Sequence, residues 1–170
     1  HKEYRRQRQM CIRDRRMFVS GDPAAIDAGR AVLDAMGAVV DCGAEPGRGQ
    51  SFKVVNQLLC AVHIVAGAEA LALAERLGLD PAEVLDAVAD GAAGSFMLSD
   101  RGPRMLEGLD AQVASAIGIF VKDSALVSAT AAEAGIAVPV LEAAKQKYLD
   151  AAEAGLTLKD DSQVIQTYRP

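Results

Sequence analysis

The sequence predicts a mainly α-helical protein that begins with a small β-α-β unit. Hydrophobic residues make up 51% of its 170 residues, but only 4% are aromatic and none is Trp. This composition favours helices packed through small and aliphatic side chains over a β-sandwich. Helix-length segments also recur along the chain between glycines and Asp-Pro pairs, which are common helix boundaries. A chain of this length is long enough to bury one sizeable core.

The β-α-β unit comes first. Two short strand-like runs, Met17–Ser20 and Ala38–Asp41, enclose a segment with helical periodicity, Ala24–Met36. Asp22-Pro23 supplies the cap and the first-turn proline of that helix, and Gly37 closes it. We interpret the unit as the tail of a larger α/β domain, because on its own it leaves bare strand edges.

A Gly- and Pro-rich segment, Cys42–Gly49, follows and indicates a hinge between two domains. The next run, Gln50–Leu77, is apolar on nearly every face, so we expect one long helix that forms the buried axis of the second domain. At 100° per residue, four polar or ionisable side chains fall within about 80° of one another on this helix. They are Lys53, Asn56, Cys60 and His63.

The rest of the chain predicts shorter helices with clear boundaries. Gly78 ends the long helix, and Asp80-Pro81 with Glu83 starts the next one with a cap, a first-turn proline and a third-position carboxylate. Gly91–Gly94 ends that helix. A helical connector and three helices are then expected over 95–108, 117–134, 139–154 and 161–168.

The charges and the cysteines limit the function classes. The net charge is −5, and residues 1–16 hold about +5, so the rest of the chain carries about −10. An acidic body argues against a nucleic-acid partner. Three cysteines without a CxxC spacing indicate a reducing, cytoplasmic setting. The longest apolar run, 58–74, is interrupted by His63 and Glu69, so we expect no membrane span, and we also expect no metal site.

Residues 1–16 need a separate interpretation. They contain no apolar stretch of the kind found in a secretory signal. Met10–Asp14, MCIRD, is similar to the translated end of a transposase adapter used in sequencing libraries. We therefore interpret the segment as non-native and exclude it from the fold. The alternative, a basic arm that binds nucleic acid, has no support further along the chain.

The most informative segment is residues 47–59, GRGQSFKVVNQLL, which places Lys53 at the start of the long apolar helix with Asn56 one turn later. Burying an ammonium group is costly unless the group is paired or loses its proton, so a lysine at this position needs a reason. A lysine in such a site is suited to general acid–base catalysis. The alternative is a lysine near a helix terminus whose amine simply extends to water.

Four motifs occur in a distinctive order along the chain. They are GRGQSFKVVNQLL, Gly94-Ser95 with Pro103-Arg104-Met105, Phe120-Val121-Lys122-Asp123, and Asp160-Asp161-Ser162-Gln163-Val164-Ile165. Together they resemble the β-hydroxyacid dehydrogenases, the 3-hydroxyisobutyrate and threonate dehydrogenase family, over residues 17–168. The resemblance implies a helical domain of the 6-phosphogluconate dehydrogenase-like C-terminal type over 47–170. A remnant of the NAD(P)-binding Rossmann domain would precede it over 17–46.

The resemblance also implies an activity. The expected reaction is oxidation of the hydroxyl group of a small β-hydroxy acid by hydride transfer to NAD or NADP, in a homodimer or higher homo-oligomer. Because the resemblance covers the back half of the family's usual chain, we interpret this chain as truncated and expect it to be inactive alone. Asn56 and Phe96 stand where the threonate branch often has His and Trp, which leaves the choice of hydroxy acid open.

Six residues take roles from the resemblance: Lys53 as general acid–base, Gly47, Gly49, Asn56 and Ser95 on the substrate, and Lys122 on the cofactor. Besides Lys53, three of them also have a simpler explanation. Asn56 is then a satisfied buried amide, Ser95 a helix N-cap, and Lys122-Asp123 an ordinary surface ion pair.

Two other functions stay open. One is a helical dimerisation module without activity, because the long apolar helix needs a large covering surface. The other is an imine-reducing relative of the same fold, against which Lys53 argues, since that class usually has another residue at this position.

Overall fold

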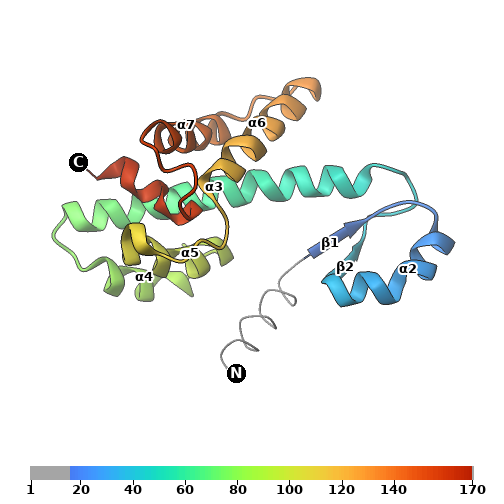
Figure 1. Ribbon diagram of the computed structural model, residues 1–170, viewed down its shortest axis with the longest axis horizontal. Coiled ribbons are helices and arrows are strands. Elements are labelled where there is room, and N and C mark those ends of the chain that lie inside the picture. The colour runs from blue at the N-terminus through green and yellow to red at the C-terminus, as the bar shows by residue number, and fades with distance from the viewer. Residues whose placement is uncertain (1–15, 170) are drawn as a thin grey trace. The chain divides into compact units, whose positions relative to one another are not determined.

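The computed structural model of the chain describes residues 16–169 (Figure 1). The chain forms two compact units, which we call the N-terminal unit, up to Asn56, and the helical unit, from Gln57 onward. Helix α3, Arg48–Arg76, contributes to both units. The segment interpreted above as non-native lies outside the described residues, apart from Arg16.

The N-terminal unit contains the expected β-α-β arrangement. Strands β1 (Arg16–Val19) and β2 (Ala38–Asp41) pair in parallel, with Met17 opposite Val39, and helix α2 (Pro23–Met36) connects them. The first strand begins and ends one residue earlier than expected, because the parallel register extends to a pair between Arg16 and Ala38. Arg16, which we had assigned to the non-native segment, therefore belongs to the sheet.

The Gly- and Pro-rich segment after β2 is bonded to the N-terminal unit. The Arg48 guanidinium donates through Nε to the Cys42 carbonyl at 2.7 Å, and the Gly21 amide donates to the Gly43 carbonyl at 3.1 Å. The boundary between the two units therefore comes later in the chain than the segment expected to act as a hinge, inside α3.

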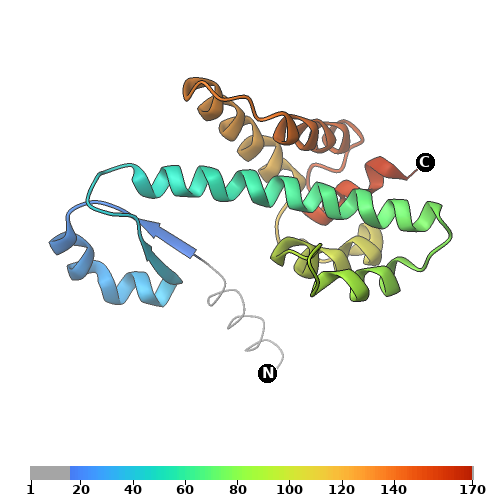
Figure 2. The same ribbon diagram turned by 180° about the vertical axis from the view of Figure 1, so that it is seen from behind.

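In the described part of the chain, the helical unit holds four further α-helices and two short 3-10 helices. They are α4 (Pro81–Ala89), α5 (Phe96–Glu107), η1 (Gly108–Asp110), α6 (Ile117–Glu133), α7 (Pro139–Glu153) and η2 (Asp161–Tyr168). Helices α6 and α7 lie side by side in both views (Figures 1 and 2). The most deeply buried apolar side chains come from five different elements of this unit: Ile64, Leu71, Met105, Ile117, Leu141, Tyr148 and Ile165.

The helix boundaries follow the local signals in the sequence. The Asp22 and Asp80 carboxylates each accept the amide of the residue two positions on, at 2.8 Å, and each is followed by a first-turn proline. Gly78 ends α3 with a φ of +74°, in the left-handed region that glycine adopts without strain. The mainly α fold with a leading β-α-β unit is thus as the sequence predicted.

The expectation that α3 is buried along its whole length is wrong. Its fully buried side chains begin at Ala61, whereas Phe52, Val55 and Leu59 are 43%, 62% and 47% exposed. An apolar pattern indicates which side chains are suited to burial, but it does not say which neighbour covers them.

The expectation that no segment has the length and composition of a membrane span is also wrong for α3. This helix is long and apolar enough to cross a membrane by those two criteria, although 44% of its most apolar stretch is buried within the protein. A core helix of a globular domain meets the same criteria, and the buried residues from Ala61 onward favour that explanation.

Candidate functional site

The candidate catalytic segment opens helix α3 with two glycines of different roles. Gly47 has a φ of +93°, and a Cβ there would meet nothing within 4 Å. Gly49 is buried, its amide donates to the Ser20 hydroxyl at 3.0 Å, and a Cβ would lie 2.6 Å from the Phe18 carbonyl oxygen. The close approach that Gly49 permits in this structure is therefore to β1, and a contact with substrate stays a prediction.

Lys53 and Asn56 lie one turn apart on the same face of α3. Lys53 is exposed, although the sequence led us to expect a lysine on a buried helix, and Asn56 is half-buried.

Ser95 is the N-cap of α5. Its hydroxyl oxygen accepts the amide of Leu98 at 3.0 Å, which confirms the capping role that the sequence allowed. The preceding Gly94 is sterically required, because a Cβ there would lie 1.9 Å from the Ala89 carbonyl oxygen. The turn between α4 and α5 thus fixes where the Ser95 hydroxyl begins the helix.

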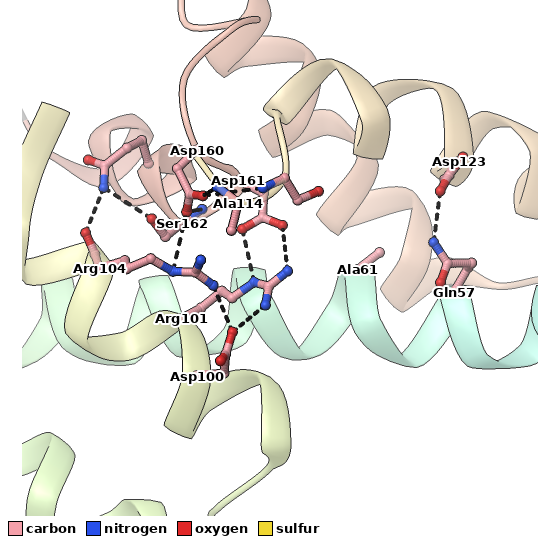
Figure 3. Close-up of polar contacts among 12 residues, drawn as sticks. Gln57, Ala61, Asp100, Arg101, Arg104, Ala114, Asp123, Asp160, Asp161 and Ser162 are labelled. Carbon is pink, nitrogen blue, oxygen red and sulfur yellow. Dashed lines mark hydrogen bonds and ion pairs between the residues drawn. The ribbon is translucent and has the colours of Figure 1, made fainter. Parts of the chain in front are cut away.

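Lys122 lies in the second turn of α6, and its side chain is 77% exposed. Its amine is 3.4 Å from the Asp123 carboxylate, and that carboxylate also accepts from the Gln57 side-chain amide at 2.7 Å (Figure 3). The Lys-Asp pair predicted from the sequence is therefore present, with Asp123 tying α6 to α3. Ser95 and Lys122 lie on separate helices of the helical unit, while Lys53 and Asn56 belong to the N-terminal unit.

A group of charged side chains on α5 and at the start of η2 is partly or fully buried and had no role in the sequence-based site. We call it the acid–arginine cluster, and it consists of Asp100, Arg101, Arg104, Asp160 and Asp161 (Figure 3). Arg101 donates through Nε and Nη2 to the two oxygens of Asp161, at 3.0 Å each, and also pairs with Asp100. Two parallel hydrogen bonds of this kind fix both distance and orientation.

Asp160 is fully buried and accepts hydrogen bonds from three backbone amides. Its Oδ2 accepts from Ala114 at 2.8 Å and Ser115 at 3.4 Å, and its Oδ1 accepts from Ser162 at 3.2 Å. Burial by itself would raise the pKa of Asp160. The hydrogen bonds from Ser162 and Ala114, together with the Arg104 charge, lower that pKa below its ordinary value.

In the pair of Asp161 and Arg101, burial and pairing have opposing effects on each pKa, and a different effect prevails for each side chain. Burial raises the pKa of the Asp161 carboxyl, against the opposing effect of the Arg101 guanidinium. Burial alone would lower the pKa of Arg101, but the hydrogen bonds to Asp161 and Asp100 raise it above its ordinary value. Breaking such a pair by removing one partner is costly, because it leaves a buried charge without compensation.

Sequence reasoning had identified the motifs that contain Arg104 and the two aspartates, but it assigned them no function. Consecutive aspartates usually lie on a solvated surface, so their composition gave no sign of burial. A signal was available in Arg101 and Arg104, which stand three residues apart in and beside a second motif and could pair with Asp160 and Asp161. Among the described residues, no group of three His, Cys, Asp or Glu side chains has the geometry of a metal site.

Comparisons with known proteins show which family and which relatives are similar to most of the chain. Residues 47–168 match the family model described as "NAD-binding of NADP-dependent 3-hydroxyisobutyrate dehydrogenase". The chain is 40% identical over 153 residues to the L-threonate dehydrogenase of Cupriavidus necator, which covers 89% of this chain and 51% of that protein. The Escherichia coli L-threonate dehydrogenase is 39% identical over the same length. The chain thus spans about half the length of the curated relatives it matches.

Two solved structures of 3-hydroxyisobutyrate dehydrogenases are also similar to this chain. A 3-hydroxyisobutyrate dehydrogenase from Salmonella typhimurium has a TM-score of 0.83 at 37% identity, over 88% of this chain and 53% of that one. The Mycobacterium tuberculosis 3-hydroxyisobutyrate dehydrogenase, solved with L-serine, has a TM-score of 0.80 at 29% identity, over 91% of this chain and 55% of that one.

Proposed function

Because the chain belongs to the 3-hydroxyisobutyrate dehydrogenase family, we propose that it supplies the helical half of an NAD(P)-dependent dehydrogenase that oxidises the hydroxyl of a small β-hydroxy acid. The carrying observation is that Lys53 stands exposed on α3 directly after the glycine turn, inside the matched residues 47–168. Threonate and 3-hydroxyisobutyrate represent the substrate class. Residues 17–46 would then belong to the nucleotide-binding half, and residues 47–170 to the substrate and dimerisation half.

Lys53 is the general acid–base of this proposal. Oxidation of an alcohol removes the hydroxyl proton while the hydride leaves the same carbon, so a base must lie against the oxygen. The neutral amine of Lys53 accepts that proton, and its ammonium form returns it in the reverse direction. The ammonium also stabilises negative charge that develops on the oxygen.

The remaining substrate contacts come from Gly47 and Asn56 in the same segment and from Ser95 at the start of α5. Asn56, one turn after Lys53, offers an amide that both donates and accepts, which suits a hydroxyl or a carboxylate. Ser95 uses its oxygen lone pair to cap α5, which leaves its O–H available to donate to a substrate carboxylate. The backbone of Gly47 is open, with no atom near its Cβ position, so a small substrate can approach it.

The residues present fit a nicotinamide dinucleotide as cofactor. Lys122 presents an exposed ammonium on α6, and this positive charge attracts the negatively charged phosphates of such a cofactor. When bound, NAD or NADP takes up the hydride. The part of Lys122 is to hold the cofactor, whereas the proton goes to Lys53.

A homodimer or higher homo-oligomer is part of the proposal. Phe52, Val55 and Leu59 expose a continuous apolar stripe at the start of α3, since they fall on one face at helical spacing. An exposed stripe of this kind marks a protein interface in many soluble proteins. We also propose a cytoplasmic setting, with no nucleic-acid or membrane partner.

A chimeric enzyme tests the catalytic assignment. Residues 17–170 are joined to the part of the Cupriavidus necator L-threonate dehydrogenase that lies outside the match, and the formation of reduced cofactor is followed with threonate or 3-hydroxyisobutyrate. Lys53→Ala should lower kcat by about 10²-fold or more, the scale of losing a general acid–base group, and leave the KM for cofactor nearly unchanged.

The matched control is Arg76→Ala, which removes the same charge from the other, exposed end of α3. It should leave kcat within about twofold of the parent, since surface charges contribute little. If Lys53→Ala retains kcat within about threefold of the parent chimera, Lys53 is not the proton-transfer residue.

A further inference from the structure

Helix α6 begins without a cap of its own. Its N-cap residue is Ala116, and no side chain within the helix accepts a hydrogen bond from its first turn. Helix starts leave backbone amides without partners, and burial of such amides is costly unless another group accepts from them. The start of α6 must therefore obtain its acceptors from elsewhere in the chain.

These acceptors come from the segment just before η2, about forty residues later. The Ile117 amide donates to the Lys159 carbonyl at 3.0 Å, and the Gly118 amide donates to the Thr157 carbonyl at 3.0 Å. Two amides that precede the N-cap residue Ala116, those of Ala114 and Ser115, donate to the Asp160 carboxylate. The Lys159 and Thr157 carbonyls thus cap α6 from a distance, and the Asp160 carboxylate holds the residues that lead into the helix.

The same segment is tied to α5 by the acid–arginine cluster. Arg101 holds Asp161 through two hydrogen bonds, and Arg104 lies 3.7 Å from the Asp160 carboxylate (Figure 3). The Gln163 side-chain amide also donates to the Arg104 carbonyl at 2.7 Å. One buried segment therefore links the two helices that carry the candidate residues Ser95 and Lys122.

We infer that Asp160 is a positioning residue for the proposed reaction, because its carboxylate fixes Ala114 and Ser115, which lead into α6, and so sets the position of Lys122 relative to Ser95. The inference rests on the proposed function. Lys122 lies five residues after Ile117, so its own backbone bonds to the first turn that the distal segment completes. Loosening that turn moves the amine that holds the cofactor, whereas Ser95 is held by its own cap at the start of α5, nine residues before Arg104.

The inference predicts a split between the two Michaelis constants. In the chimeric enzyme, Asp160→Asn should raise the KM for NAD(P) about tenfold and leave the KM for the hydroxy acid within about twofold, because a displacement near 1 Å of a binding group is costly. Asp150→Asn on α7 is the matched control, since it makes the same chemical change in a carboxylate whose bonds within residues 16–169 go to Gln146 and Lys147 on its own helix. It should change neither constant.

A second pair of variants keeps the test decisive if Asp160→Asn fails to fold. A Cβ on Gly118 would lie 3.0 Å from the Thr157 Cγ2, so Gly118→Ala pushes the distal segment away from α6. Gly118→Ala should raise the KM for NAD(P), and adding Thr157→Ser, which removes that methyl group, should restore part of the loss, since the Thr157 carbonyl oxygen would still lie 3.3 Å from the new Cβ.

The outcomes separate this inference from the proposed function. If Lys122→Ala leaves the KM for NAD(P) unchanged, the cofactor assignment of Lys122 fails, and the inference fails with it. If Lys122→Ala raises that KM while folded Asp160→Asn and Gly118→Ala do not, only the positioning role is overturned. Equal changes in kcat and in both KM values would also overturn it, since they indicate general loosening of the helical unit.

Discussion

The turn between α4 and α5 provides a sharp test of how this chain is packed. Gly94 donates its amide to the Gly91 carbonyl at 2.9 Å and directly precedes Ser95, the cap of α5. A Cβ on Gly94 would lie 1.9 Å from the Ala89 carbonyl oxygen, whereas a Cβ on Gly91 would come no closer than 3.6 Å to any atom. Substitution by Ala in this short turn is therefore sterically blocked at Gly94 but has room at Gly91.

Gly94→Ala should lower the free energy of unfolding by about 2–4 kcal/mol. The backbone must retreat by about 1 Å to make room, and overpacking of this kind costs about 1–3 kcal/mol. The retreat also weakens the turn hydrogen bond and the Ser95 cap, worth about 1 kcal/mol each. The smaller entropy of Ala in the unfolded chain offsets about 0.4–1 kcal/mol of the total.

Urea unfolding of the 170-residue chain, followed by far-ultraviolet circular dichroism, measures the effect. With a slope of about 2 kcal/mol per molar urea, the Gly94→Ala midpoint should fall by about 1–2 M. Gly91→Ala is the control and should stay within about 0.5 kcal/mol of the parent. Equal midpoints for the two variants would refute the steric argument.

Two further predictions concern buried ionisable groups. The Tyr148 hydroxyl donates to the Ala61 carbonyl at 3.0 Å, so Tyr148→Phe should cost about 1 kcal/mol in urea unfolding at neutral pH. Burial raises the pKa of Tyr148. The contribution of Tyr148 to stability is therefore present below the ordinary tyrosine pKa of about 10 and is lost as the pH rises further. Tyr148→Phe should accordingly show a smaller fall in melting temperature at alkaline pH than the parent. The lowered pKa of Asp160 has the opposite sign: its contribution is present above the ordinary aspartate value of about 3.9 and is lost as the pH falls through the folded value. Asp160→Asn should thus be less stable at pH 7 but lose less on acidification, and a melting temperature that falls as steeply with acid as in the parent would contradict this.

Local signals in the sequence were sufficient for most helix boundaries. Asp80-Pro81 and Gly78 act on their immediate neighbours, so the residues that decide each boundary lie within a few positions of it. The Ser95 cap was recognised as one of two alternatives for the same reason. The motifs around Lys53 and Lys122 identified the family, because a short run of residues is enough to recognise them.

Long-range interactions account for what the sequence did not reveal. The start of α6 at Ile117 has no local cap, and its acceptors come from residues 157–160, which no short pattern connects to it. The burial of Asp160 depends on Arg104, 56 positions earlier, and on backbone amides from a third segment. The exposure of Val55 likewise depends on the packing of distant segments, which its own neighbours in the sequence do not reveal.

Because residues 157–160 cap the start of α6, these two distant segments should open together when the fold opens locally. The amides of Ala114, Ile117 and Gly118 are protected from exchange with solvent deuterium by groups between Thr157 and Asp160. They become accessible when that C-terminal segment detaches, even while the rest of α6 stays wound. Hydrogen exchange should therefore show the two stretches opening as one unit, and a nascent chain acquires this protection only after residues 157–160 have been synthesised.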